Sequence, residues 1–232
     1  MHFAPLGDRA VMITLGNAIS EATHRRVRAV TARLTARPPA GIIDVVPAFA
    51  SVAVHYDPFL AGRHEGASPF RDMVTALEEF LADIADDALP SPRLVDIPVC
   101  YGGELGPDLE NVAAKHDMDA AEVVRIHITG NYLVYMIGFM PGFAYLGGLS
   151  DQIATPRRST PRTVVPAGTV GIGGQQTGVY PLDSPGGWNL IGRTPIKIFD
   201  IGREEPTLLA TGDRVRFRAI SLEEFRERSA RS

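Results

Sequence analysis

The order of apolar and polar residues predicts alternating strands and helices over the first hundred residues. Short apolar runs or strict alternation predict strands at 10–15, 42–46, 51–56 and 94–100. A first helix is expected between Ser20 and Pro38, with apolar positions at Ile19, Val27, Val30 and Leu34. The clearest helix follows Ser68 and has Pro69 at its first position, with one apolar stripe made by Phe70, Met73, Leu77, Phe80 and Ile84.

This order of elements predicts an α+β protein whose N-terminal part is a ferredoxin-like α/β sandwich. The succession β-α-β-β-α-β is the one found in that fold, with 94–100 as its last strand. The X-Pro steps of Pro90-Ser91-Pro92 favour extended chain and predict a hinge between domains. We therefore expect two domains, residues 1–92 and 93–232, although strand 94–100 is compatible with either sheet.

Glycine and proline dominate the second half of the chain. Residues 138–195 contain 12 of the 23 glycines and 7 of the 18 prolines, a density that prevents long helices. Between these residues lie short apolar runs, which predict strands at 133–139, 163–165, 196–201 and 214–219. Two short helices are expected before this stretch, at 108–116 and after Asp119, and one helical turn in the tail 221–232. Many short strands with few helices are typical of a closed β-barrel.

Four arginines against a single acid make residues 155–195 a cationic stretch in an acidic chain. Arg157, Arg158, Arg162 and Arg193 are opposed by Asp183 alone, while the whole chain carries a net charge of −4. The guanidinium group offers a planar fork of donors that matches a carboxylate or a phosphate, so an anion site is predicted. The alternative is that these are surface or ion-paired arginines, because arginine supplies 21 of the 23 basic residues.

Turns in the same stretch present aromatic rings and backbone N–H groups. Phe139 and Phe143 are flanked by glycine and proline, and they form either an apolar wall beside a polar site or part of the barrel core. The turn from Ser184 to Gly187 offers backbone N–H groups beside Trp188, and such groups can bind an anion. Their alternative role is the structure of a tight turn.

Amide, hydroxyl and imidazole groups are the remaining candidates. Gln176 and Thr177 place hydrogen-bonding side chains on a turn. His127 ends the helix that begins after Asp119, and an imidazole with a pKa of ~6.5 suits general acid or base catalysis near neutral pH. A single histidine at a helix end more often has a structural role.

Several common chemistries are excluded by missing motifs. Neither Lys115 nor Lys197 follows a glycine, so there is no P-loop, and neither a Gly-x-Ser-x-Gly elbow nor a His-Glu-x-x-His zinc motif occurs. The single cysteine, Cys100, excludes an intrachain disulfide and a cysteine-based metal cluster, and we predict no metal ligands. The negative net charge argues against nucleic-acid binding. No signal peptide and no apolar run of ~20 residues occur, which predicts a cytoplasmic protein without a membrane span.

Three long motifs in fixed order resemble the KipI / allophanate hydrolase subunit 1 family, which includes the B-type subunit of the bacterial ATP-dependent 5-oxoprolinase. They are GFMPGFAYLGGL at 138–149, PRRSTPRTVVPAGTV at 156–170 and QQTGVYPLDSPGGWNLIGRTP at 175–195. The resemblance is dense over 127–212 and collinear over the rest. Its one local departure is the Gly171-Ile172-Gly173 step, which is richer in glycine than the family pattern. The resemblance implies a ferredoxin-like N-terminal domain and a cyclophilin-like C-terminal β-barrel.

The resemblance further implies a subunit of an ATP-dependent 5-oxoprolinase, a lactam hydrolase that is inactive without its partners. ATP, with Mg²⁺, would phosphorylate the lactam oxygen of 5-oxoproline, and water would open the ring to give glutamate. His127 and Arg158 are the expected catalytic residues. The expected partners of this hetero-oligomer are a homologous barrel subunit of the allophanate hydrolase subunit 2 type and a third subunit. The alternative to ATP binding by this chain is ATP binding by one of these partners. The expected residues for binding substrate and nucleotide are Phe139, Phe143, Arg157, Arg162, Gln176, Thr177, Ser184, Gly187, Trp188 and Arg193.

Two alternatives from other classes remain open at the level of sequence. Some relatives inhibit a sporulation histidine kinase, in which case the barrel would be an interaction surface with an exposed apolar patch. Others resemble part of urea carboxylase, in which case the chain would bind urea or carboxybiotin without hydrolysing ATP. The family name alone does not assign amide hydrolysis to this chain, because the serine-serine-lysine signature of amidases is absent.

Overall fold

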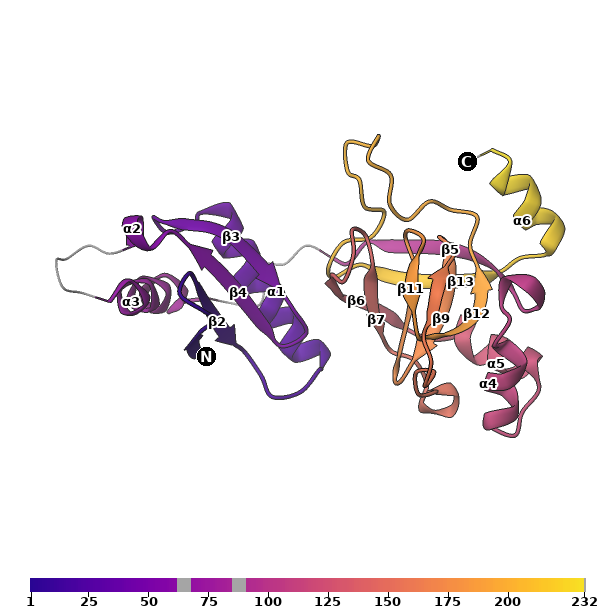
Figure 1. The fold of residues 1–232 in the computed structure, drawn as a ribbon. Helices are drawn as coiled ribbons and strands as arrows, with labels where there is room; N and C mark the ends of the chain where they lie inside the picture. The colour runs from indigo at the N-terminus through magenta and orange to yellow at the C-terminus, as the bar shows by residue number, and fades with distance from the viewer. Residues whose placement is uncertain (62–67, 85–90, 232) are drawn as a thin grey trace. The chain divides into compact units, whose positions relative to one another are not determined.

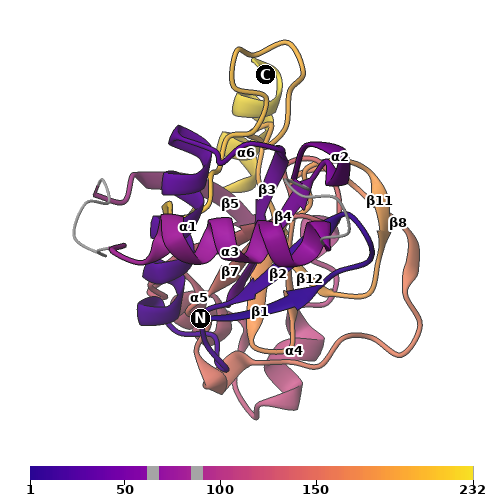
Figure 2. The ribbon, with the colours of Figure 1, turned by 90° about the vertical axis from the view of Figure 1, so that its left-hand side faces the viewer.

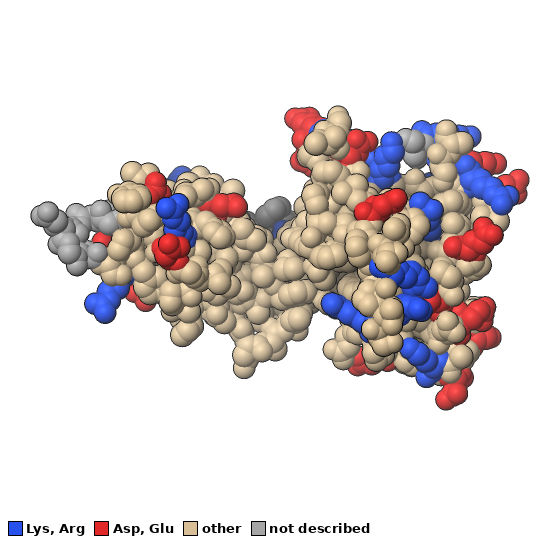
Figure 3. All heavy atoms as spheres, viewed as in Figure 1, with Lys and Arg blue, Asp and Glu red and all other residues tan. Residues whose placement is uncertain are grey.

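The computed structural model describes residues 1–61, 68–84 and 91–231, and the chain divides into two compact units, Met1–Ser91 and Pro92–Ser232 (Figure 1). Pro90 of the predicted hinge lies outside the described residues. No helix in the described part of the chain combines the length and apolar character needed to cross a membrane. On the face of the second unit seen in Figure 3, basic and acidic side chains are interspersed.

The first unit is an antiparallel sheet with helices on one face. The strands lie in the order β1-β2-β4-β3, and helices α1 and α3 cover one face of this sheet (Figures 1 and 2). Its elements are β1 (His2–Pro5), β2 (Ala10–Thr14), α1 (Glu21–Ala36), β3 (Ile42–Pro47), β4 (Ser51–Tyr56), α2 (Pro58–Ala61) and α3 (Pro69–Leu81).

The sequence pattern explains both long helices of this unit, with corrections at their ends. The Ser20 hydroxyl accepts a hydrogen bond from the Thr23 N–H and caps α1, as its position predicts. Ile19 was wrongly placed on the apolar stripe, because it precedes the cap and is exposed. Ile84 lies beyond the end of α3, although it still packs against the core.

The fourth strand of this sheet is not the one that the sequence pattern predicted. The run 94–100 is a barrel strand, β5 (Leu94–Tyr101), and the edge position beside β2 is filled by the N-terminal strand β1. The four residues of β1 alternate only weakly between apolar and polar, which is too short a pattern to predict a strand. Pairing with β2 (Ala10–Thr14) stabilises them as an edge strand. The order of the other three strands remains that of a ferredoxin-like sandwich.

The second unit is a closed barrel of seven strands, which confirms the barrel predicted from the short apolar runs. The order around it is β10-β7-β6-β13-β5-β12-β9, and only the pair β13–β5 is parallel. Strands β11 and β8 form a separate antiparallel pair. The strands after β5 are β6 (Tyr132–Ile137), β7 (Ala144–Gly147), β8 (Arg162–Val165), β9 (Thr169–Gly173), β10 (Gln176–Val179), β11 (Ser184–Gly186), β12 (Asn189–Arg193) and β13 (Arg214–Ala219).

Helices close the barrel and supply part of its core. Helices α4 (Leu109–Lys115) and α5 (Ala120–Ile128) pack on each other and place Val112 and Val123 in the core. The Asp119 carboxylate accepts from the Glu122 N–H and caps α5, as predicted. Two short 3₁₀ turns lie at Gly103–Leu105 and Asp151–Ile153.

Two predictions near the C-terminus were wrong. Residues 196–201 are not a strand, because this segment pairs only through one bridge between Phe199 and Thr207 at the base of a long loop. The tail is more ordered than one turn: α6 (Leu222–Ser229) has Ser221 as its cap, with the hydroxyl accepting from the Glu224 N–H.

Candidate functional site

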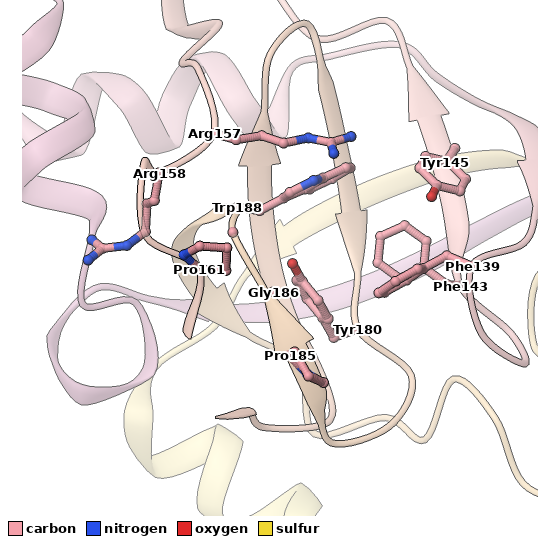
Figure 4. Close-up of a pocket in the computed structure, with 11 residues that line it drawn as sticks. Phe139, Phe143, Tyr145, Arg157, Arg158, Pro161, Tyr180, Pro185, Gly186 and Trp188 are labelled. Carbon is pink, nitrogen blue, oxygen red and sulfur yellow. The ribbon is translucent and has the colours of Figure 1, made fainter. Parts of the chain in front are cut away.

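A pocket of about 310 Å³ lies on the outer side of the barrel wall (Figure 4). Leu146 belongs to the barrel core, so its neighbour Tyr145 on the same strand points outward, into this pocket. The pocket is lined by Phe139, Phe143, Tyr145, Arg157, Arg158, Pro161, Tyr180, Pro185, Gly186, Gly187 and Trp188.

Trp188 lies directly against the backbone of the barrel wall because glycines face it. A Cβ at Gly173 would lie 2.6 Å from the indole Nε1, and one at Gly171 would lie 3.1 Å from the Cβ of Trp188. A Cβ at Gly178 on β10 would lie 3.3 Å from the same ring. The glycine-rich step in β9 is therefore a consequence of seating the only tryptophan on the outer face of the strand.

An aromatic cluster forms one wall of the pocket. Phe143 is buried and makes edge-to-face contacts with Phe139, Tyr145, Tyr180 and Trp188, at ring-centre distances of 4.9 to 5.6 Å. Phe139 is 65% exposed and has a φ of +72°, in the left-handed region that residues other than glycine rarely adopt. Such strained residues concentrate at binding sites, where the surrounding structure maintains them.

Arg157 is the cation that the pocket presents to a ligand. Its guanidinium carbon lies 5.8 Å from the centre of the Trp188 ring, over the ring face (Figure 4). It has no ion-pair partner among residues 1–61, 68–84 and 91–231. Arg158 also lines the pocket, but its guanidinium points away from Arg157 and donates to Asp108 at 3.2 Å.

Asp108 anchors the segment that carries Arg157. Its carboxylate is buried at the start of α4 and accepts two hydrogen bonds from Arg162, each 2.9 Å, and one of 2.7 Å from the Leu190 N–H. Burial alone would raise the pKa of this carboxyl. The hydrogen bonds from Arg162 and Leu190 and the charges of Arg162 and Arg158 outweigh burial and lower the pKa.

Half of the predicted site residues meet at the pocket, and half lie elsewhere. Phe139, Phe143, Arg157, Arg158, Gly187 and Trp188 line it. Outside this lining are His127, Arg162, Gln176, Thr177, Ser184 and Arg193. Tyr145 and Tyr180 also line the pocket but were not among the predicted site residues. The direction of Tyr145 depends on the strand register of β7, and Tyr180 lies just beyond the end of β10.

The four arginines expected to form one anion site have different partners in the structure. Arg162 is committed to Asp108, and the Arg193 Nε donates to the Ala167 carbonyl at 2.8 Å. The Ser184 hydroxyl is buried without a hydrogen-bond partner among the described residues. Gln176 begins β10, where it pairs with Gly173.

His127 and Thr177 lie together inside the barrel. His127 is fully buried, with its Nε2 3.0 Å from the Thr177 hydroxyl and its Nδ1 2.8 Å from the Tyr101 hydroxyl. Burial lowers the pKa of the imidazole to about 3. The ring does not line the pocket, and an imidazole that stays neutral at ordinary pH is a poor proton carrier there.

The described residues contain no group of three or more His, Cys, Asp or Glu side chains arranged to hold a metal ion. The pocket itself offers one free guanidinium and mainly aromatic surface. These groups suit a small ring with one carboxylate. They do not fit a triphosphate with its metal ion, which needs several cationic or oxygen ligands.

The chain belongs to the family described as "Carboxyltransferase domain, subdomain C and D", whose model matches residues 1–209 and so covers the first unit and most of the barrel. It is 49% identical over 223 residues to the B-type 5-oxoprolinase subunit of Bacillus subtilis, across 95% of this chain and 93% of that protein. The protein of the same name from Haemophilus influenzae is 41% identical over 223 residues, across 96% of this chain and 100% of that protein. The family resemblance found in the motifs is thus confirmed.

A solved structure supports the fold. The protein TTHA0988 is 37% identical and superposes with a TM-score of 0.79, across 92% of this chain. The match spans only 40% of that longer protein.

Proposed function

We infer that this chain is a subunit of 5-oxoprolinase and propose that its pocket binds 5-oxoproline. The main support is sequence identity of 41 to 49% to 5-oxoprolinase subunits over nearly the whole chain. The size and lining of the pocket also suit this substrate. A pocket of about 310 Å³ is at the small end of ligand sites. It suits a five-membered lactam better than a nucleotide.

In this proposal the aromatic wall holds the lactam ring and Arg157 binds its carboxylate. The guanidinium can donate two parallel hydrogen bonds to a carboxylate. Its position over Trp188 keeps it desolvated on one side, which strengthens the interaction. Phe139 at the exposed edge would exclude water from the bound ring.

ATP supplies the phosphoryl group that activates the lactam oxygen. The pocket of this chain has no surplus cations for a triphosphate, and we propose that ATP and Mg²⁺ bind mainly through a partner subunit whose site faces this pocket. The chain alone would then bind 5-oxoproline without hydrolysing it.

The direct test is conversion of 5-oxoproline to glutamate with ATP, using this chain alone and with the other 5-oxoprolinase subunits. We expect activity in the mixture only. An assembled complex that leaves 5-oxoproline unchanged would rule out the proposed function, and inhibition of a histidine kinase or binding of urea would then be measured.

Replacement of Arg157 by glutamine is expected to weaken 5-oxoproline binding by roughly tenfold to a hundredfold, the usual value of a hydrogen bond to a charged group. The measurement is quenching of Trp188 fluorescence by 5-oxoproline, with KM of the assembled enzyme as a second readout. Arg203→Gln, outside the pocket lining, is the matched control and should bind normally. Unchanged affinity in Arg157→Gln would show that the carboxylate binds elsewhere.

A further inference from the structure

The wall between the pocket and the barrel interior is one strand thick at β9 and β10. Trp188 lies on the outer face of this wall, against Gly171, Gly173 and Gly178. Successive residues of a strand point to opposite faces, so Thr177 points inward where Gly178 faces the tryptophan. Thr177 is fully buried and reaches His127.

The hydrogen bonds around His127 define which of its nitrogens carries the proton. The Thr177 hydroxyl lies 2.9 Å from the Gly171 carbonyl oxygen, which can only accept, so the single hydroxyl proton goes there. The Thr177 oxygen must then accept from His127 Nε2–H at 3.0 Å. On the other side, Nδ1 accepts from the Tyr101 hydroxyl.

Packing fixes the position of the imidazole. The ring lies 4.6 Å from the centre of the Phe217 ring and 5.4 Å from that of Tyr132. The Tyr132 hydroxyl donates to the His127 backbone carbonyl at 2.7 Å, which ties the end of α5 to the barrel. The Nε2–H is therefore a donor at a fixed position in a buried site, where an unpaired partner is costly.

We propose that His127 is a positioning residue for the pocket: through Thr177 and the Gly171 carbonyl it holds β9 and β10 in the spacing that seats Trp188. This inference rests on the proposed function, because it assigns His127 to the same binding site. His127 acts from the opposite side of the wall and does not contact substrate.

Two pairs of variants distinguish a positioning role of His127 from a role in stability alone. Thr177→Val removes the hydroxyl on the pocket side, whereas Tyr101→Phe removes the hydroxyl on the far side of the ring. In His127→Asn the amide lies near the place of Nδ1, so the hydrogen bond to the Thr177 hydroxyl is lost. In His127→Gln the amide N–H lies near the place of Nε2, so this hydrogen bond is kept. Both histidine variants lose the same ring contacts, so similar losses of stability are expected.

Ligand-free readouts come from Trp188, the only tryptophan. We expect a shifted emission maximum and at least a twofold rise in acrylamide quenching in Thr177→Val and His127→Asn. Affinity for 5-oxoproline should fall by roughly fivefold to tenfold in these two variants, with kcat of the assembled enzyme changed less than KM. Tyr101→Phe and His127→Gln should remain near wild type in both readouts.

Equal effects of all four variants, or normal Trp188 signals in Thr177→Val, would overturn the positioning role and leave His127 as ordinary core. If wild-type protein gives no response to 5-oxoproline, the proposed ligand is wrong. The emission and quenching data still decide the positioning role in that case, because they need no ligand.

Discussion

Replacement of Asp108 by alanine is expected to lower the free energy of unfolding of the barrel unit by about 3 kcal/mol. The carboxylate is buried and is shared by Arg162, Arg158 and the Leu190 N–H. Its removal leaves the buried Leu190 N–H without an acceptor and two guanidinium groups without their counter-charge. Because both arginines are partly exposed, they can turn toward water, which keeps the loss below that of a fully buried pair.

The same change should also weaken ligand binding, because the anchored segment carries Arg157. Denaturant unfolding followed by Trp188 fluorescence reports the barrel unit without interference from the first unit. Asp96→Ala is the control: its pair with Arg216 is exposed to solvent, and its loss should have little effect on stability. Equal stabilities of the Asp108 and Asp96 variants would contradict the anchoring role.

Local signals in the sequence were sufficient for most helices. A capping side chain and the first turn are neighbours in the chain, so Ser20 and Asp119 identified the starts of α1 and α5 correctly. The cap predicted at Ser68 has the right position but makes no side-chain hydrogen bond. Pro69 at the first helical position favours the start of α3 without a capping hydrogen bond, because its fixed φ suits a helix.

Strand predictions failed where pairing depends on distant residues. The apolar run 196–201 has the composition of a strand, yet it pairs only through the bridge between Phe199 and Thr207, and Ile201 is exposed. The N-terminal residues 2–5 lack a strong pattern, yet they form β1 because β2 offers an open edge. Strand pairing is decided by which edges remain free after the rest of the sheet has formed.

The candidate site was only partly predictable for the same reason. The motifs identified Arg157 and Trp188, but charge alone could not separate Arg157 from Arg158 and Arg162, which follow within five residues. Their different tasks depend on Asp108, 54 residues before Arg162 in the sequence. A single sequence carries no signal for such a pairing.

Acidification is expected to destabilise the barrel unit through His127, lowering its free energy of unfolding by roughly 2–3 kcal/mol between pH 7 and pH 4.5. Burial lowers the pKa of this imidazole to about 3 in the folded protein, whereas an imidazole in the unfolded chain titrates near pH ~6.5. Between these values the unfolded chain binds a proton that the folded chain does not. The stabilisation is therefore complete above about pH 6.5 and is lost as the pH falls toward 3.

The measurement compares wild type with His127→Gln by Trp188-monitored unfolding at intervals from pH 7 to 4.5. The variant should be less stable at pH 7, and the gap should narrow by roughly 2–3 kcal/mol toward pH 4.5, because glutamine does not titrate. All other titratable groups are common to both proteins, so their contributions cancel from the difference. A gap that stays constant would mean that the imidazole gains its proton at the same pH in the folded protein as in the unfolded chain. At pH 4.5 the folded protein would then hold an imidazolium whose Nδ1–H donates to the Tyr101 hydroxyl, and burial would not keep the imidazole neutral.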